Sequence, residues 1–425
     1  MESKRIYYSL YSRLLSESAL AAALVKVKKA DGSAGIDKQS TADFALNKDE
    51  EIRLLLSELK TKSYRPLPVL RVEIPKDDGG VRQLGVPAVR DRVVQQALLD
   101  ILQPIFEEDF HPSSFGYRPK RSCHHAITKA QLFIRKYDMK HVVDMDLSKC
   151  FDTLDHELII KCFGKRVKDG SILGLLELFL KSGVMDKEEF KPSELGSPQG
   201  GVISPLIANV YLNEFDQEMM KRGHRIVRYA DDILIFTRSK SAAGNALSKA
   251  KVILEDKLKL TVNKEKTHLA HSSSGIKFLG VMIFCNSTRI QQKKIDSFKE
   301  KVKRITKRNS PVNLQKVINE LRPKMRGFAN YFRIANCKTL FRELMPWIRR
   351  RLRSKQLKLW KKASKLLRVL RQRGYRGEFK SIKMTSWRNS CSKHAHYAMP
   401  NSFFEELKLF DLSKVETGIS VPFVV

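Results

Sequence analysis

Apolar residues recur with two different periods along this chain, and the balance between them changes near residue 291. Residues 14–27 and 89–110 carry apolar side chains at helical spacing, which predicts amphipathic helices. Short β-prone runs alternate with helical runs over residues 131–288, and the pattern after residue 291 is helical. The sequence therefore predicts an α+β region followed by an α-helical one.

One β-prone run, RYADDILIF at residues 228–236, contains two adjacent carboxylates, Asp231 and Asp232. Side chains alternate faces along a strand, so neighbouring aspartates converge on one point only where the chain turns. We expect a strand, a turn and a strand, with the pair at the tip. Adjacent carboxylates are more often found on solvated loops. Here, however, repulsion between half-buried carboxylates favours a bound divalent cation with oxygen ligands, and Mg²⁺ is the natural choice.

A second acidic segment lies upstream at residues 142–152, VVDMDLSKCFD, with carboxylates at Asp144, Asp146 and Asp152. A two-metal site for phosphoryl transfer requires a further carboxylate from a separate strand, because the ions clamp both the attacking and the leaving oxygens. Between the two acidic segments, residues 196–216 form a Gly- and Pro-rich loop and then a helical apolar run.

These segments, in this order, resemble reverse transcriptases, most closely the reverse transcriptase/maturase proteins of bacterial group II introns, of the compact type without an HNH endonuclease. Further matching segments are GSAGID at 32–37, the hairpin sequence at 64–98, SFGYRP at 114–119, LTVNKEKT at 260–267 and FLG at 278–280. The resemblance implies a right-hand polymerase, with fingers and a palm around a central antiparallel sheet, followed by an α-helical thumb/maturase domain. The implied domains are an N-terminal extension (1–60), fingers (61–130), palm (131–288), thumb/maturase domain (289–355) and a basic C-terminal nucleic-acid-binding region (356–425).

The resemblance also implies the catalytic residues. The metal-binding aspartates fall on Asp146, Asp231 and Asp232, which would hold two Mg²⁺ ions, with Mn²⁺ as a possible substitute. Asp146 is chosen because it stands five residues before Phe151. Whether Asp144 or Asp152 assists the metal site stays open.

The nucleotide-binding residues implied by the resemblance are Lys76, Arg82, Phe151, Gln199 and Lys266. Lys76 and Arg82 flank the turn DDGG of a predicted hairpin and would bind the triphosphate, although surface basic residues are the ordinary alternative. The ring of Phe151 would exclude a ribose 2′-hydroxyl, the group that distinguishes RNA from DNA. Gln199 would lie near the nucleotide and template, and Lys266 could donate a proton to the leaving pyrophosphate.

Charge points to the same class of partner. The chain has 80 Lys and Arg against 46 Asp and Glu, a formal net charge of +34, and nucleic acid is the commonest partner of so basic a protein. Residues 347–374 predict one basic helix, from Pro346 to Gly374. Its expected phosphate contacts are Arg349, Arg350, Arg353, Lys358 and Lys361, although a solvated face is the ordinary alternative.

No apolar run approaches the roughly twenty residues that span a bilayer, and the six cysteines form no CxxC pair. We expect a cytoplasmic bacterial protein associated with nucleic acid. The expected function is RNA-directed DNA synthesis from an RNA template, a DNA or RNA primer and dNTPs, together with binding of group II intron RNA for splicing and retrohoming. Two alternatives stay open: a free-standing enzyme of host defence or DNA repair, and a protein that is mainly an RNA-binding splicing cofactor.

Overall fold

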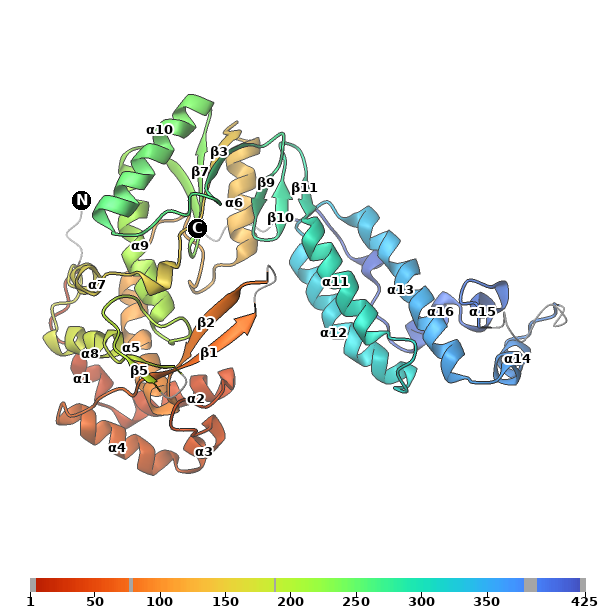
Figure 1. Ribbon diagram of the computed structural model, residues 1–425, viewed down its shortest axis with the longest axis horizontal. Coiled ribbons are helices and arrows are strands. Elements are labelled where there is room, and N and C mark those ends of the chain that lie inside the picture. The colour runs from red at the N-terminus through yellow and green to blue at the C-terminus, as the bar shows by residue number, and fades with distance from the viewer. Residues whose placement is uncertain (1–4, 76–78, 187–188, 378–387, 421–425) are drawn as a thin grey trace. The chain divides into compact units, whose positions relative to one another are not determined.

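The computed structural model describes residues 5–75, 79–186, 189–377 and 388–420 (Figure 1). The chain divides into two compact units, Met1–His271 and Ser272–Val425. The predicted boundary between palm and thumb at residue 288 therefore falls inside the second unit. The residues after His271 form their own small sheet, so they belong with the helices that follow them.

The first unit begins with helices, as predicted for residues 1–60. These are α1 (Tyr11–Leu14), α2 (Glu17–Ala30), α3 (Thr41–Leu46) and α4 (Lys48–Lys60). The apolar run at 14–27 is interrupted, because Ser16 starts a new helix and its hydroxyl accepts a hydrogen bond from the Ala19 amide at 3.3 Å. Helix α2 packs against α5 (Val89–Glu107), the amphipathic helix expected at 89–110.

A mixed sheet with strand order β2-β1-β4-β5 carries the predicted hairpin. Strands β1 (Val69–Pro75) and β2 (Val81–Val86) pair antiparallel, with Ile74 opposite Arg82. Strands β4 (Val184–Asp186) and β5 (Glu189–Lys191) complete the sheet, and β4 runs parallel to β1. Helices α7 (His156–Phe163) and α8 (Gly170–Leu180) lie in the same unit.

The second sheet is entirely antiparallel, with strand order β6-β7-β3-β8. Its strands are β6 (Arg225–Tyr229), β7 (Asp232–Thr237), β3 (His141–Met145) and β8 (His268–His271). Branched apolar residues such as Val143 and Ile235 are fully buried in it. Helices α6 (Cys123–Arg135), α9 (Ser204–Lys221) and α10 (Lys240–Lys251) pack against the sheet.

The second unit is mostly helical, as predicted. It contains an antiparallel sheet of β9 (Ile276–Phe278), β10 (Val281–Ile283) and β11 (Thr288–Ile290). Its helices are α11 (Gln292–Ile305), α12 (Leu314–Phe332), α13 (Lys338–Leu359), α14 (Ala363–Gln372), α15 (Lys393–Ala398) and α16 (Asn401–Glu406).

The single helix predicted over residues 347–374 is wrong at both its start and its middle. Helix α13 begins at Lys338, and Pro346 lies inside it, because burial of flanking apolar residues such as Leu344 and Ile348 offsets the hydrogen bond that proline cannot make. The helix ends at Leu359, and the chain then turns at Lys361, whose φ of 61° is left-handed, before α14 begins.

Candidate active site

The two adjacent aspartates lie where β6 returns as β7. The hairpin pairs Tyr229 with Asp232, so Ala230 and Asp231 form the turn. Ala230 has a φ of 58°, in the left-handed region that side chains with a Cβ rarely adopt. The predicted hairpin with the Asp pair at its tip is confirmed.

Asp146 reaches the same place from the neighbouring strand. Strand β3 pairs with β7 so that Met145 lies opposite Ile233, and continuing this register places Asp146 opposite Asp232. Asp144 lies two residues earlier and therefore on the same face of β3. The three acids predicted as catalytic thus come together from two adjacent strands.

The carboxylates of this cluster affect one another's pKa values. Although Asp232 is reached by solvent, the surrounding protein desolvates its carboxylate, and this desolvation, together with the negative charges of Asp231 and Asp146, raises its pKa to about 7. Asp144 adds to the same effect. Desolvation and the charge of Asp146 also raise the pKa of Asp231, while Arg82 and Lys266 oppose the rise.

Asp146 has two polar neighbours from the loop after η2 (Val252–Lys257). Its Oδ2 lies 3.4 Å from Lys266 Nζ and accepts a hydrogen bond from Asn263 Nδ2 at 3.2 Å. The exposed ammonium group of Lys266 therefore stands beside the acidic cluster, where the sequence predicted it. Asn263 was not predicted, and the only sequence signal for it is its place in the segment LTVNKEKT.

The two flanking acids are not equivalent. Asp144 contributes to the raised pKa of Asp232, and its Oδ2 lies 3.9 Å from His268 Nε2. Desolvation raises the pKa of Asp152, and the charges that oppose this rise come from Lys149 and Arg71. Asp144 is therefore the better candidate for assisting the site.

Arg82 lies on β2 and interacts electrostatically with the turn. Its positive charge opposes the rise in the pKa of Asp231, so the two side chains are close enough to interact. Arg82 is exposed and thus accessible to a ligand. Lys76, its predicted partner across the hairpin turn, lies outside the described residues.

Phe151 lies in the short 3₁₀ helix η1 (Cys150–Asp152) and is buried, 8% exposed. Its ring meets the ring of Tyr117 edge-on, with centroids 6.3 Å apart. Although Tyr117 is exposed, desolvation of its hydroxyl and the charge of Asp231 raise its pKa, so this tyrosine lies near the Asp pair. Tyr117 was missed as a site residue, although it stands in the quoted segment SFGYRP.

The loop that contains Gln199 is hydrogen-bonded both to β2 and to Phe151. Its backbone carbonyl at Gln199 accepts a hydrogen bond from the Gly85 amide at 2.7 Å, and its Ser197 amide donates to the Phe151 carbonyl at 2.7 Å. A Cβ on Gly200 would lie 2.4 Å from the Gly85 carbonyl oxygen, so only glycine allows this approach. The Gln199 loop is thus hydrogen-bonded both to Phe151 and to β2, the strand that carries Arg82.

Comparison with known proteins points to the family that the sequence motifs resemble. Residues 74–283 match the family "Reverse transcriptase (RNA-dependent DNA polymerase)", and residues 295–374 match "Group II intron, maturase-specific domain". "Protein YkfC" of Escherichia coli (strain K12) is 34% identical over 316 residues, which cover 66% of this chain and 83% of that protein. The chain belongs to the group II intron reverse transcriptase/maturase family.

Two further relatives extend well beyond the region that matches this chain. "Group II intron-encoded protein LtrA" of Lactococcus lactis subsp. cremoris is 28% identical over 341 residues, 65% of this chain and 54% of that protein. "Putative COX1/OXI3 intron 2 protein" of Saccharomyces cerevisiae is 30% identical over 284 residues, 53% of this chain and 33% of that protein. The α+β reverse transcriptase fold with a helical C-terminal region, predicted from the sequence, is confirmed, and this enzyme is an RNA-directed DNA polymerase.

The donor set of the reverse transcriptase site fits a divalent cation. Carboxylate oxygens are the ligands that Mg²⁺ prefers, and desolvation together with the charge of Asp146 raises the pKa values of Asp231 and Asp232. Within the described residues, no three His, Cys, Asp or Glu side chains are already spaced as a formed metal site. The carboxylates are nevertheless close enough to feel one another's charge.

The basic residues predicted to contact phosphates fall into two groups. Arg350, Lys358 and Lys361 are exposed. Arg353 is 4% exposed, donates to the Met399 carbonyl at 2.9 Å and lies 5.3 Å from the centre of the Phe404 ring, which contradicts its predicted role as a phosphate contact.

Arg349 is also engaged within the protein. Its Nη2 lies 2.9 Å from Asp411 Oδ2, and both side chains are mostly buried. It remains a weaker candidate for RNA binding than the exposed residues.

Among the helices that the structure describes, none is long and apolar enough to cross a membrane.

Proposed function

We propose that this reverse transcriptase copies RNA into DNA at a site in which Asp146, Asp231 and Asp232 hold two Mg²⁺ ions, for which Mn²⁺ can substitute. The substrates are an RNA template, a DNA or RNA primer and dNTPs. The observation that carries the proposal is the convergence of three carboxylates from β3 and the β6–β7 turn, with raised pKa values at Asp231 and Asp232. When bound, the ions would stabilise the charge on the attacking and leaving oxygens of an in-line displacement.

The residues around the cluster would position the nucleotide. Arg82, exposed and close to Asp231, is placed to bind the triphosphate with its planar fork of donors. The ring of Phe151 would close off the space beside the sugar carbon that bears a hydroxyl only in ribonucleotides. The Gln199 loop would hold both, because its backbone is hydrogen-bonded to β2 and to Phe151.

Lys266 has two possible tasks that follow from its position. Its ammonium group partly neutralises Asp146 at 3.4 Å, and it is exposed enough to reach a bound phosphate. A lysine that can approach both groups could pass a proton to the leaving pyrophosphate.

We also propose that the second unit binds group II intron RNA and so assists splicing and retrohoming. The maturase-specific match at residues 295–374 supports this function. Arg350, Lys358 and Lys361, on α13 and in the turn after it, are exposed and place positive charge where phosphates can reach it.

A primer-extension assay tests the polymerase function. The full chain, given a DNA primer annealed to an RNA template, dNTPs and Mg²⁺, should extend the primer to the template end, and EDTA should abolish extension. Extension that is equally fast in EDTA would contradict the metal assignment. No extension on RNA with either Mg²⁺ or Mn²⁺ would contradict the polymerase function itself.

A further inference from the structure

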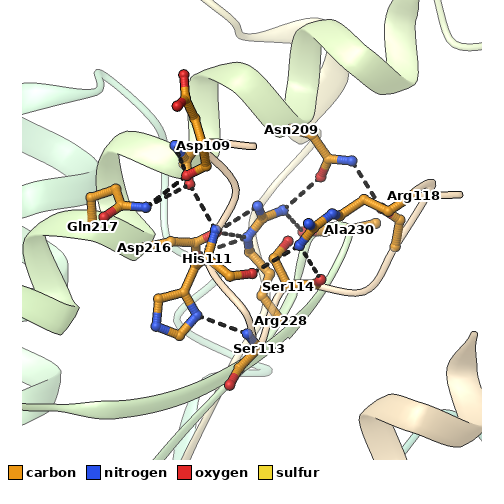
Figure 2. Close-up of polar contacts among 12 residues, drawn as sticks. Asp109, His111, Ser113, Ser114, Arg118, Asn209, Asp216, Gln217, Arg228 and Ala230 are labelled. Carbon is orange, nitrogen blue, oxygen red and sulfur yellow. Dashed lines mark hydrogen bonds and ion pairs between the residues drawn. The ribbon is translucent and has the colours of Figure 1, made fainter. Parts of the chain in front are cut away.

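A fully buried arginine lies directly beneath the catalytic turn. Arg228, on β6, is 0% exposed and is among the largest completely buried side chains of the protein. Figure 2 shows its guanidinium group surrounded by polar partners. It donates to both carboxylate oxygens of Asp216 from Nε at 2.9 Å, and again to Oδ2 from Nη2 at 2.6 Å. Asp216, on α9, is also 0% exposed, so this is a closed ion pair with no net charge.

The third guanidinium nitrogen of Arg228, Nη1, bonds to the turn itself. Its Nη1 donates to the Ala230 carbonyl at 3.0 Å and to Asn209 Oδ1 at 3.1 Å. Ala230 is the residue with left-handed φ that precedes Asp231. One side chain thus joins helix α9 to the peptide group next to the catalytic pair.

The Ala230 amide is also closely packed against the chain at Gly116. A Cβ on Gly116 would lie 2.4 Å from the Ala230 amide nitrogen, so this glycine lets the chain pack directly against the turn. The Gly116 carbonyl accepts a hydrogen bond from Asn209 Nδ2 at 2.8 Å, and Asn209 in turn accepts from Arg228. Gly116 and Arg228 therefore both contact Ala230, and Asn209 links them by hydrogen bonds to each.

Stability alone does not account for this arrangement. A buried ion pair is often no more stabilising than apolar residues of the same volume, because desolvation of both charges opposes their attraction. The planar fork of arginine can bind both oxygens of a carboxylate and still direct a donor at a backbone carbonyl. Because Asp216 neutralises the guanidinium, Arg228 acts on the site through geometry.

We propose that Arg228 is a positioning residue, which fixes the Ala230 peptide and so orients Asp231 and Asp232 toward the metal ions. This inference rests on the proposed metal-binding function of the two aspartates. It assigns no contact with substrate to Arg228. The effect would be large, because displacing a reacting group by about 1 Å can cost roughly 100-fold in rate.

The first test uses Arg228→Lys in the full chain, which keeps a positive charge opposite Asp216 but loses the fork. Mn²⁺ binding, followed by electron paramagnetic resonance, should weaken by about tenfold or more, and kcat for primer extension should fall by a similar factor. The KM for primer–template should stay within about twofold of wild type. Mn²⁺ affinity and kcat both within twofold of wild type, in a folded protein, would overturn the proposal.

A second variant keeps the test decisive if the lysine disturbs folding. Arg228→Met combined with Asp216→Met replaces the pair by apolar side chains and leaves no buried charge. This protein should also lose at least tenfold in Mn²⁺ affinity; wild-type affinity would overturn the proposal.

Two references separate the possible failures. Arg166→Lys is the matched control, because Arg166 is also mostly buried, with its side chain 6% exposed, and also forms ion pairs, with Glu108 at 3.2 Å and with Asp109. It should leave Mn²⁺ affinity unchanged, and a loss equal to that of Arg228→Lys would overturn the specific role of Arg228. Asp231→Asn with Asp232→Asn shows whether the wild type binds Mn²⁺ at the turn at all. If that double variant binds Mn²⁺ like the wild type, the metal site itself is wrong and the proposal is overturned with it.

Discussion

The acidic turn between β6 and β7 and the basic helix α13 both concentrate charge of one sign, but the fold treats them differently. At the turn, Asp231 and Asp232 lie beside a third carboxylate, and their pKa values are raised. On α13, buried basic side chains are paired with fixed acceptors. Lys355 is 0% exposed and donates to the carbonyls of residues 307 and 310 at 3.2 and 2.9 Å, and Arg353 donates to the Met399 carbonyl.

This difference separates charges that serve the fold from charges that serve a ligand. A buried ammonium group with two carbonyl acceptors is satisfied within the protein, and removing it leaves those acceptors unpaired. Neighbouring carboxylates that raise one another's pKa repel each other, and a bound divalent cation removes that repulsion. A charged residue in the sequence does not show which of these two roles it has. The partners of its side chain in the structure do.

The largest expected effect is on catalysis at the acidic turn. Asp232→Ala should lower kcat for primer extension on RNA by roughly two orders of magnitude or more, because it removes stabilisation made mainly in the transition state. The fold should be retained, since the change removes one of several repelling charges. Steady-state kinetics and a melting curve on the same preparation check both statements, and near-normal extension would contradict the site.

The next effect is on the stability of the second unit. Lys355→Glu places a carboxylate against two carbonyl oxygens and should destabilise the protein by about 3 kcal/mol or more. Lys358→Glu, three residues further along at an exposed position, is the matched control and should change stability by less than about 0.5 kcal/mol. Thermal melting of the two variants side by side distinguishes them, and equal melting temperatures would break the comparison.

A smaller effect is expected on the choice of sugar. Phe151→Ala should lower the preference for dNTPs over rNTPs by roughly tenfold or more, because removing the ring opens space for a ribose 2′-hydroxyl. The ratio of kcat/KM for dNTP and rNTP incorporation measures the change. Unaltered discrimination, with extension intact, would mean that Phe151 is only a core residue.

The smallest effect is on RNA capture by the exposed residues of the second unit. Charge reversal at Arg350 and Lys358 should flatten the dependence of RNA affinity on salt by about 0.7 to 0.9 in log-log slope for each lost phosphate contact. On a short primer and template at low salt, kcat should stay within a few-fold of wild type. An unchanged slope would show that these residues form only a solvated face.

Local sequence pattern was enough to predict the hairpin with the Asp pair, the strand before Asp146 and the helical second half. These elements follow from alternation and periodicity, which a sequence displays directly. Burial of individual charges could not be predicted in the same way. The helical stripe on α13 was visible, but Arg353 and Lys355 are covered by segments that are distant in sequence, around residues 399 and 307–310.

The same reason explains what was missed at the site. Tyr117 and Asn263 stand beside the carboxylates because the chain returns there from other elements. The break at Lys361 depends on one left-handed residue that is not glycine, for which the sequence gives no signal.

The central claim, that the carboxylates at the turn form a binding site for divalent metal, can be tested by one melting experiment. Mg²⁺ binds the folded site and not the unfolded chain, so it should raise the melting temperature of the wild type in a concentration-dependent manner. The rise should be lost in the Asp231→Asn, Asp232→Asn double variant. An equal rise in both proteins would contradict the account, because Mg²⁺ would then be acting elsewhere.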